Sequence, residues 1–211
     1  MKDTRSGIVY TNLSGDSKLS AENETALAEL IYDTDPYIYP AMFGSRENAA
    51  AVLPFLYYSD DRMFRLDRFY AAVHNGRVIG LLLWVKGRLN WSPEPLRAAF
   101  LRAGIRPGPY LDAVAGEYVG KYAEGERDGL ISLINLCVAP CCRGKGVGRA
   151  LMRSFMEQHP GSAFELCVLT GNKAAVHLYS SLGFEITERY NGFSIDHRRL
   201  DAAVMRRRVS L

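Results

Sequence analysis

Two stretches near the start of the chain place apolar residues three and four positions apart, the spacing of a helix with one buried face. The first covers residues 20–32, with Ser20 suited to the N-cap, and the second covers residues 45–58. Between them, residues 34–44 combine two prolines and a glycine with Tyr37, Tyr39 and Phe43, which predicts an irregular segment rich in aromatic surface. Before both, residues 8–11 predict a short strand.

Beyond residue 69 the pattern changes to short β-rich runs. Residues 69–74 and 77–86 flank Asn75-Gly76, a strong signal for a tight antiparallel hairpin. Helices are predicted at 93–103 and 110–123. Strands at 130–138, 163–169, 184–190 and 203–209 then alternate with helices at 146–158 and 172–182. Strand–helix–strand connections of this length imply parallel pairing, so the fold class is α/β, a mixed sheet flanked by helices.

Composition narrows the classes of protein. The chain has 211 residues, 48% hydrophobic and 23% charged, which suits one globular domain. A net charge of +3 is too small to indicate a nucleic-acid partner. Arg198, Arg199 and the run at 206–208 lack interleaved aromatic residues, so they are interpreted as a solvated strand edge rather than a nucleic-acid interface.

The four cysteines, at positions 137, 141, 142 and 167, form no CxxC pair, so neither a zinc site nor any other metal is expected. They are interpreted as reduced thiols of a cytoplasmic protein. The N-terminal residues lack the apolar core of a signal peptide, and no run approaches the roughly 18 apolar residues of a membrane span, so no membrane association is expected.

A glycine-rich segment joins the strand at 130–138 to the next helix. Glycines at alternate positions let backbone N–H groups converge, and the helix start adds a partial positive charge. Basic side chains add full charges, so the segment suits a pyrophosphate; a glycine-rich turn with incidental basic residues is the alternative. The spellings GxxxxGKS/T and GxGxxG are both absent. This anion cradle consists of Arg143, Gly144, Lys145, Gly146, Val147, Gly148 and Arg149.

With its flanks, this segment resembles the GNAT superfamily of acetyltransferases. The family signature R/Q-x-x-G-x-G/A, between a strand and a helix, matches Arg143, Gly146 and Gly148. A second family motif has an Asn opening a helix, a Tyr within it and Gly-Phe-Glu after it, and residues 172–185 are similar to it. The resemblance is strong over residues 131–190 and weak before residue 69.

The resemblance implies one N-acetyltransferase domain over residues 1–211, with a core motif at 130–190 and a variable N-terminal helical part at 1–65. It implies a twisted mixed sheet whose parallel strands splay at the CoA site. The activity implied is direct attack of a primary amine on acetyl-CoA through a tetrahedral intermediate. The partners implied are therefore acetyl-CoA and an amine acceptor, and a homodimer is compatible with the family.

Site residues follow from the same resemblance. The pantetheine arm would pair with the backbone of Leu136, Cys137 and Val138, and an N–H of Cys137 or Val138 would stabilise the oxyanion. Asn172 suits both a helix N-cap and a ligand contact. Ala175 is expected beside the cofactor. Tyr179 would protonate the leaving thiolate, the alternative being a core aromatic residue.

The acceptor side is less determined by sequence. The acceptor has to attack as a neutral amine, so a base is expected, and the carboxylates considered are Asp112, Glu117 and Glu165, besides backbone carbonyls acting through water. His74 and His177 are further options, and Cys137 invites a covalent route that the resemblance argues against. Tyr37, Tyr39 and Phe43 are predicted to wall the acceptor cleft, or else to clamp the first two helices together.

One further alternative is a protein that binds acyl-CoA without turnover. Pure binding needs the anion cradle but gives Tyr179 no role. The presence of Tyr179 at the family position therefore favours an enzyme over a sensor.

Overall fold

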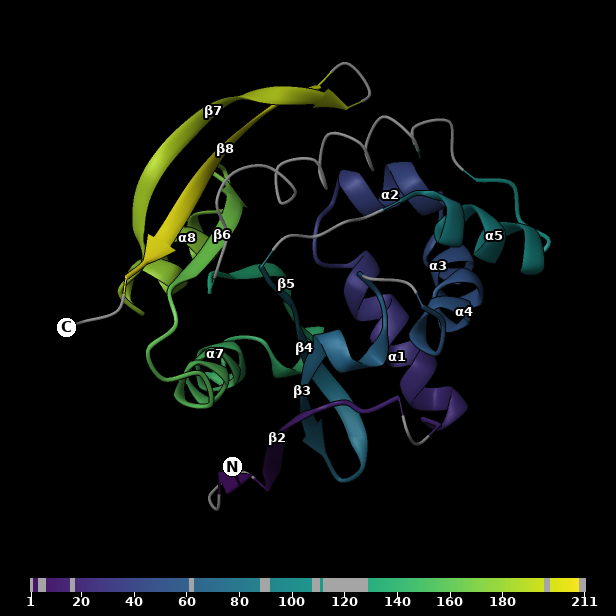
Figure 1. The fold of residues 1–211 in the computed structure, drawn as a ribbon, viewed down its shortest axis with the longest axis horizontal. Helices are drawn as coiled ribbons and strands as arrows, with labels where there is room; N and C mark the ends of the chain where they lie inside the picture. The colour runs from purple at the N-terminus through teal and green to yellow at the C-terminus, as the bar shows by residue number, and fades with distance from the viewer. Residues whose placement is uncertain are drawn as a thin grey trace.

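The computed structural model describes residues 2–3, 7–15, 18–60, 63–87, 92–107, 111, 129–195 and 198–208. Within these residues, strands form one eight-stranded sheet in the order β1-β2-β3-β4-β5-β6-β8-β7. All neighbouring strands pair antiparallel except β5 and β6, which are parallel. The prediction of a mixed α/β sheet flanked by helices is confirmed. Figure 1 shows the curved β7–β8 hairpin extending beyond the central strands.

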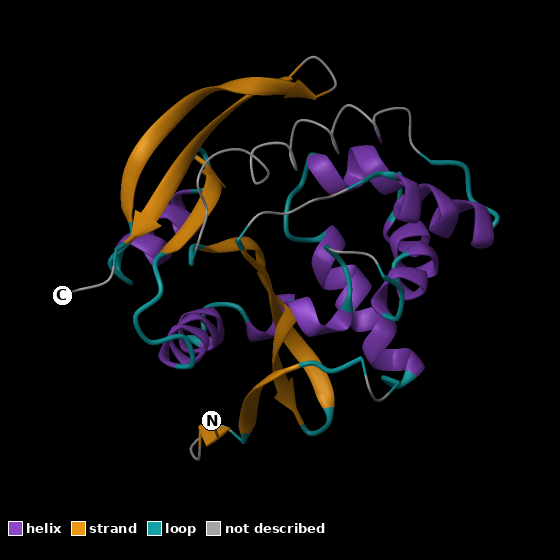
Figure 2. Cartoon of the chain, in the orientation of Figure 1, coloured by secondary structure: helices purple, strands orange, loops and turns teal. Residues whose placement is uncertain are grey.

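The strands are β1 (Lys2–Asp3), β2 (Ile8–Asn12), β3 (Phe69–His74), β4 (Arg77–Lys86), β5 (Ile131–Val138), β6 (Phe164–Leu169), β7 (Glu185–Ile195) and β8 (Arg198–Arg207). The helices are α1 (Ala21–Tyr32), α2 (Ile38–Phe43), α3 (Arg46–Val52), α4 (Pro54–Tyr57), α5 (Glu94–Arg102), α7 (Val147–Glu157) and α8 (Lys173–Ser180), with 3-10 turns η1 (Leu66–Arg68) and η2 (Pro140–Cys142). Most predicted elements are therefore present, and Figure 2 shows how the helices surround the strands.

Several predicted boundaries are corrected. Residues 34–44 contain the short helix α2, because the Asp35 carboxylate accepts hydrogen bonds from N–H groups at the start of this helix. The predicted helix at 45–58 divides into α3 and α4 at Pro54, which has no N–H to continue the hydrogen-bond ladder. The last two strands are longer than predicted because they pair as one hairpin. Of the helix predicted at 110–123, all but Leu111 lies outside the described residues.

The hairpin between β3 and β4 has the predicted turn. Asn75 has φ 50° and Gly76 has φ 76°, so both central residues are left-handed, as a two-residue hairpin turn of type I′ requires. This turn sets the register in which β3 pairs with β4, and β4 pairs on its other edge with β5.

Two hydrophobic clusters cover the two faces of the sheet. One contains buried residues of α1 to α5 together with one face of β3, β4 and β5. The other contains buried residues of α7 against the opposite face, together with β6 and Phe184. The strands β3, β4 and β5 contribute to both clusters, so these strands separate the two halves of the core.

A bulge in β5 changes which side chains face which cluster. Leu83 of β4 pairs with Asn135 and Trp84 pairs with Leu133, so Ile134 is an extra residue on β5. Ile134 joins the α1–α5 cluster, and the next residue also contacts it, since Tyr39 of α2 donates a 2.8 Å hydrogen bond to Oδ1 of Asn135. The bulge thereby bends β5 at the middle of its length.

The Tyr39–Asn135 bond gives a stability prediction. Both side chains are buried, with exposed fractions of 1% and 2%. Tyr39→Phe leaves the Asn135 oxygen without its donor, and such a loss costs about 1–3 kcal/mol of unfolding free energy. The change is measured from the midpoint of urea unfolding. Tyr32→Phe is the control, because no hydrogen bond of the half-buried Tyr32 hydroxyl is found among the described residues; equal midpoints for the two variants would contradict the prediction.

Candidate active site

The parallel strands β5 and β6 part in the middle of the sheet. Their pairing runs from Ile131 and Phe164 to Leu133 and Leu166, whereas β5 continues to Val138 and β6 to Leu169. The strands separate just where Ile134 bulges. The region of separation opens onto a cavity of about 500 Å³ that Ile134 and Leu136 line from one side and Cys167, Val168 and Leu169 from the other.

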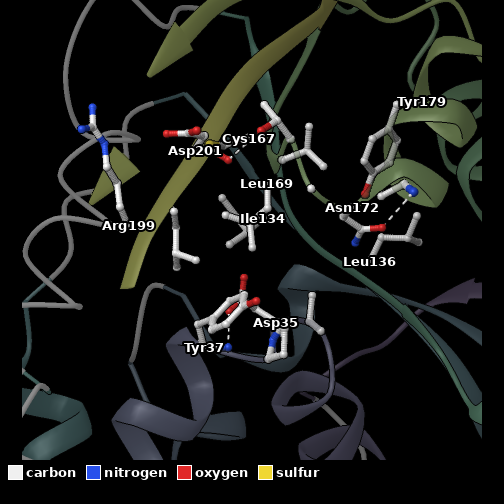
Figure 3. Close-up of a pocket in the computed structure, with 17 residues that line it drawn as sticks. Asp35, Tyr37, Ile134, Leu136, Cys167, Leu169, Asn172, Tyr179, Arg199 and Asp201 are labelled. Atoms are coloured by element: carbon white, nitrogen blue, oxygen red, sulfur yellow. Dashed lines mark hydrogen bonds between the residues drawn. The ribbon is translucent and has the colours of Figure 1, made fainter. Parts of the chain in front are cut away.

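The cavity has two ends of different chemistry (Figure 3). At one end lie the start and inner face of α8, with Asn172, Ala175 and Tyr179. At the other lie the segment between α1 and α2 and the first half of β8. The residues of this second end are Thr34, Asp35, Pro36, Tyr37, Arg199, Leu200 and Asp201.

The anion cradle lies between the end of β5 and the start of α7. Gly146 caps α7 with φ 81° and Gly144 has φ 73°, conformations that favour glycine. A Cβ at either glycine would meet nothing within 4 Å, so the space above the helix start is open. Lys145 is exposed and Arg149 is half-buried. An eleven-residue helix beginning at an open, basic loop fits the pyrophosphate of CoA.

Gly148 lies in the first turn of α7, between β5 and α8. A Cβ there would lie 3.5 Å from Val138 and 4.0 Å from Leu178, which are ordinary van der Waals contacts. The signature glycines therefore differ, since the backbone conformation at Gly146 favours glycine, whereas the space around Gly148 would accept a Cβ.

Arg143 folds back over the end of β5. Its Nε donates a 2.9 Å hydrogen bond to the Val138 carbonyl, and its guanidinium lies 4.0 Å from the Cys137 sulfur. Burial raises the pKa of the Cys137 thiol, and the nearby Arg143 only opposes this effect. A thiol with a raised pKa stays protonated at neutral pH, so Cys137 has the character of a small buried apolar residue rather than a nucleophile.

Two residues of the second motif lie on the cavity wall. The Asn172 side chain accepts a 3.1 Å hydrogen bond from the Ala175 N–H, so it caps α8 while also lining the cavity. Tyr179 is half-buried, with its ring centroid 6.0 Å from that of Phe184. Burial raises the pKa of the Tyr179 hydroxyl, which therefore carries its proton at neutral pH, as a general acid has to.

The three aromatic residues predicted on the acceptor side separate into two groups. Tyr37 lines the cavity. Tyr39 and Phe43 do not: each is 1% exposed, their rings stack at 6.2 Å, and both belong to the α1–α5 cluster. The expectation that all three wall the cleft is corrected for Tyr39 and Phe43, because helix α2 turns these two rings inward.

Of the predicted base candidates, the three side chains that the structure describes do not line the cavity. Glu165 is 4% exposed and ion-paired with Arg206 at 2.7 Å, away from the cavity lining. His74 and His177 are exposed and line no part of it. Glu117 and Asp112 lie outside the described residues. Sequence reasoning did not name as base candidates the two carboxylates that do line the cavity, Asp35 and Asp201, although the capping sequence Asp35-Pro36 before α2 was a usable signal.

Comparisons with known proteins agree with this architecture. A family model described as an acetyltransferase (GNAT) domain matches residues 110–186. The N-alpha-acetyltransferase RimI of Mycobacterium tuberculosis is 33% identical over 126 residues, covering 56% of this chain and 75% of that protein. The ribosomal protein bS18-alanine N-acetyltransferase of Escherichia coli K12 is 36% identical over 84 residues, covering 38% of this chain and 57% of that enzyme.

Solved structures share the fold over nearly the whole length of the chain. A crystal structure described as an acetyltransferase superposes with a TM-score of 0.61 at 20% identity, covering 96% of this chain and 100% of the other. The ribosomal-protein-S18-alanine N-acetyltransferase of E. coli superposes with a TM-score of 0.53 at 17% identity, covering 97% and 95%.

A strand–loop–helix cradle beside splayed parallel strands defines a fold that binds acyl-CoA, and this chain belongs to the GNAT superfamily of acetyltransferases. It is an N-acetyltransferase, and acetyl-CoA is its co-substrate. Among the residues that the structure describes, no helix is long and apolar enough to cross a membrane. The same residues contain no cluster of side chains able to hold a metal ion.

Proposed function

We propose that this enzyme transfers the acetyl group of acetyl-CoA to a primary amine by direct attack, with Tyr179 as the general acid. The observation that carries the proposal is that one cavity between β5 and β6 has Tyr179 at one end and charged side chains at the other. A thioester placed between these ends would have a proton donor for its sulfur on one side and room for an amine on the other.

The cofactor would enter from the side of α7 and α8. Its pyrophosphate would bind the anion cradle, and its pantetheine arm would run between the separated strands along Leu136, Cys137 and Val138. Strands that part leave backbone N–H and C=O groups in need of partners, which the amides of pantetheine can supply. Asn172 and Ala175 would lie beside this arm, since both line the same end of the cavity.

We treat residues 1–211 as one catalytic domain. Described strands from both halves of the chain form one sheet, and the segment between α1 and α2 lines the same cavity as α8. In this proposal residues 130–190 bind the cofactor, and the N-terminal part shapes the acceptor side.

The names of the relatives make a protein α-amine the first acceptor to test. Purified enzyme is incubated with acetyl-CoA and a panel of acceptors: peptides with free N-terminal alanine, the same peptides with blocked N-termini and an internal lysine, and small polyamines. Thiol release and product mass are followed. A peptide that gains one acetyl group at its α-amine supports the proposal. Acetyl-CoA binding without turnover of any amine would favour the sensor instead.

Tyr37 supplies a kinetic prediction for the acceptor end of the cavity. It is half-buried on the wall, and its ring can pack on the alkyl part of an amine or on its cation. Tyr37→Ala should raise KM for the acceptor by roughly 5-fold, equivalent to about 1 kcal/mol, while KM for acetyl-CoA and Tm stay close to those of the parent. A variant that melts several degrees lower with unchanged acceptor KM would give Tyr37 a packing role instead.

A further inference from the structure

The cavity holds two carboxylates that differ in their surroundings. Asp35 follows α1 and is half-buried, whereas Asp201 of β8 is exposed to solvent. Among the described residues of the cavity lining, these are the only acidic side chains. A group that removes a proton from an amine has to lie where the amine docks, so one of these two is the natural candidate.

Asp35 is held in place by the backbone. Its Oδ1 accepts hydrogen bonds from the N–H groups of Tyr37 and Ile38, both at 2.7 Å. Pro36, which follows directly, fixes its own φ and restricts the preceding residue. One carboxylate oxygen is thus anchored, and no described residue donates a hydrogen bond to Oδ2. Figure 3 shows Asp35 beside Tyr37 at the cavity wall.

The other titratable groups of the cavity are poorly suited to the task. Cys167 is half-buried, and the sulfur of a thiol is only a weak hydrogen-bond acceptor. Arg199 is a permanent cation and would repel an ammonium. Asp201 lies in water, where a carboxylate interacts weakly with an ammonium because solvent screens the charge.

We propose that Asp35 binds the ammonium form of the acceptor through Oδ2 and takes its proton, directly or through one water. This inference rests on the proposed transfer to a primary amine and assigns the base that the sequence left open. It also implies a substrate class: the acceptor arrives as a cation, so neutral nucleophiles such as alcohols are poor acceptors.

The proton balance is complete with the groups present. The ammonium gives one proton to Asp35, and the neutral nitrogen forms a bond to the thioester carbon while the carbonyl electron pair moves to oxygen. Collapse of the intermediate breaks the C–S bond, and the thiolate takes the proton of the Tyr179 hydroxyl. The second proton on nitrogen restores that hydroxyl, and Asp35 releases its proton to water.

The surroundings of Asp35 favour this exchange. Burial raises the pKa of its carboxyl, and the two backbone hydrogen bonds oppose the rise. A peptide α-amine has a pKa of about 7.7–8.0. A raised carboxyl pKa therefore reduces the pKa difference between the ammonium donor and the carboxylate acceptor. The anchored oxygen keeps the carboxylate pointing into the site while the other oxygen accepts the proton.

The test is Asp35→Asn, which retains an oxygen able to accept the bonds from Tyr37 and Ile38 but has no charge. The acceptor is an alanine-initiated peptide, and kcat/KM is measured from pH 6 to 9.5. We expect a loss of roughly 100-fold near pH 6.5, the scale of general base catalysis, that shrinks as the pH passes the pKa of the peptide amine. The melting temperature and the affinity for acetyl-CoA, measured by calorimetry, should match those of the parent.

Two matched variants make the result decisive. Asp60→Asn removes an exposed carboxylate that lines no part of the cavity and should leave kcat/KM unchanged at every pH. Asp201→Asn removes the other carboxylate of the cavity. The assignment is overturned if Asp201→Asn rather than Asp35→Asn gives the loss that depends on pH. It is equally overturned if Asp35→Asn is fully active or loses activity equally at all pH values. Failure of the parent to acetylate the peptide would instead count against the proposed function.

Discussion

Tyr179→Phe should reduce kcat by roughly 100-fold or more, the usual scale for loss of a general acid. The substitution keeps the ring that packs near Phe184 and removes only the hydroxyl that would protonate the CoA thiolate. Affinity for acetyl-CoA should hardly change. The effect is measured by thiol release under conditions in which the chemical step limits turnover, with acetyl-CoA affinity measured separately by calorimetry.

Tyr58→Phe is the matched control, because it deletes a phenol hydroxyl outside the cavity. The Tyr58 hydroxyl contacts Leu19 and Glu24, on the side of the molecule formed by α1 and α4. This variant should keep the parent kcat even where its stability falls. An unchanged kcat for Tyr179→Phe in the same assay would assign Tyr179 to packing alone.

The raised pKa of Tyr179 also predicts a pH dependence. A general acid works in its protonated form, so its activity is present below its pKa and is lost as the pH rises through it. Because burial places the pKa of Tyr179 above the ordinary value of about 10, no fall in kcat from this group should occur between pH 7 and pH 10. A fall in kcat near pH 8 in the parent enzyme, absent from Tyr179→Phe, would contradict a raised pKa for Tyr179.

Gly146→Glu should weaken acetyl-CoA binding at least ~10-fold, equivalent to about 1.4 kcal/mol. The substitution places a carboxylate at the start of α7, where the pyrophosphate is expected, and the two negative charges repel. The backbone adds a second effect, since φ is 81° at this position and a side chain there costs about 1–2 kcal/mol of stability. Affinity is measured by calorimetry, and stability by thermal unfolding.

Gly146→Gln separates charge from backbone strain. It has the size and the strained conformation of the Glu variant but no charge, so the two should melt at similar temperatures. Acetyl-CoA should bind the Gln variant more tightly than the Glu variant, with the difference shrinking at high salt. If Gly146→Glu binds acetyl-CoA as well as the parent, the pyrophosphate binds elsewhere.

Much of the fold could be predicted because its local signals agree with its tertiary contacts. Asn75-Gly76 forms its turn from backbone preference alone, and the amphipathic pattern of residues 146–158 matches α7. The approximate location of the cavity also followed from the Gly146 and Tyr179 motifs. These elements depend on residues that are close together in the chain, so a single sequence is enough to predict them.

What could not be predicted depends on contacts between distant residues. Nothing in the sequence distinguishes Tyr37 from Tyr39 and Phe43. Only the orientation of α2 places the rings of Tyr39 and Phe43 in the core and Tyr37 at the cavity. The bulge at Ile134 arises from the pairing of β5 with β4 and leaves no mark in the apolar pattern of β5. Asp35 likewise lines the cavity only because the segment after α1 and strand β8 lie on the same cavity wall in the folded chain.

Direct transfer in a ternary complex is tested most directly by initial velocities with both substrates varied. Acetyl-CoA and an alanine-initiated peptide are varied together, and the intact mass of the enzyme is recorded after incubation with acetyl-CoA alone. Direct transfer gives intersecting double-reciprocal lines, and no acetylated enzyme is expected, because the Cys137 thiol is buried with a raised pKa. Parallel lines, together with an acetyl group on Cys137 or Cys167, would contradict direct attack.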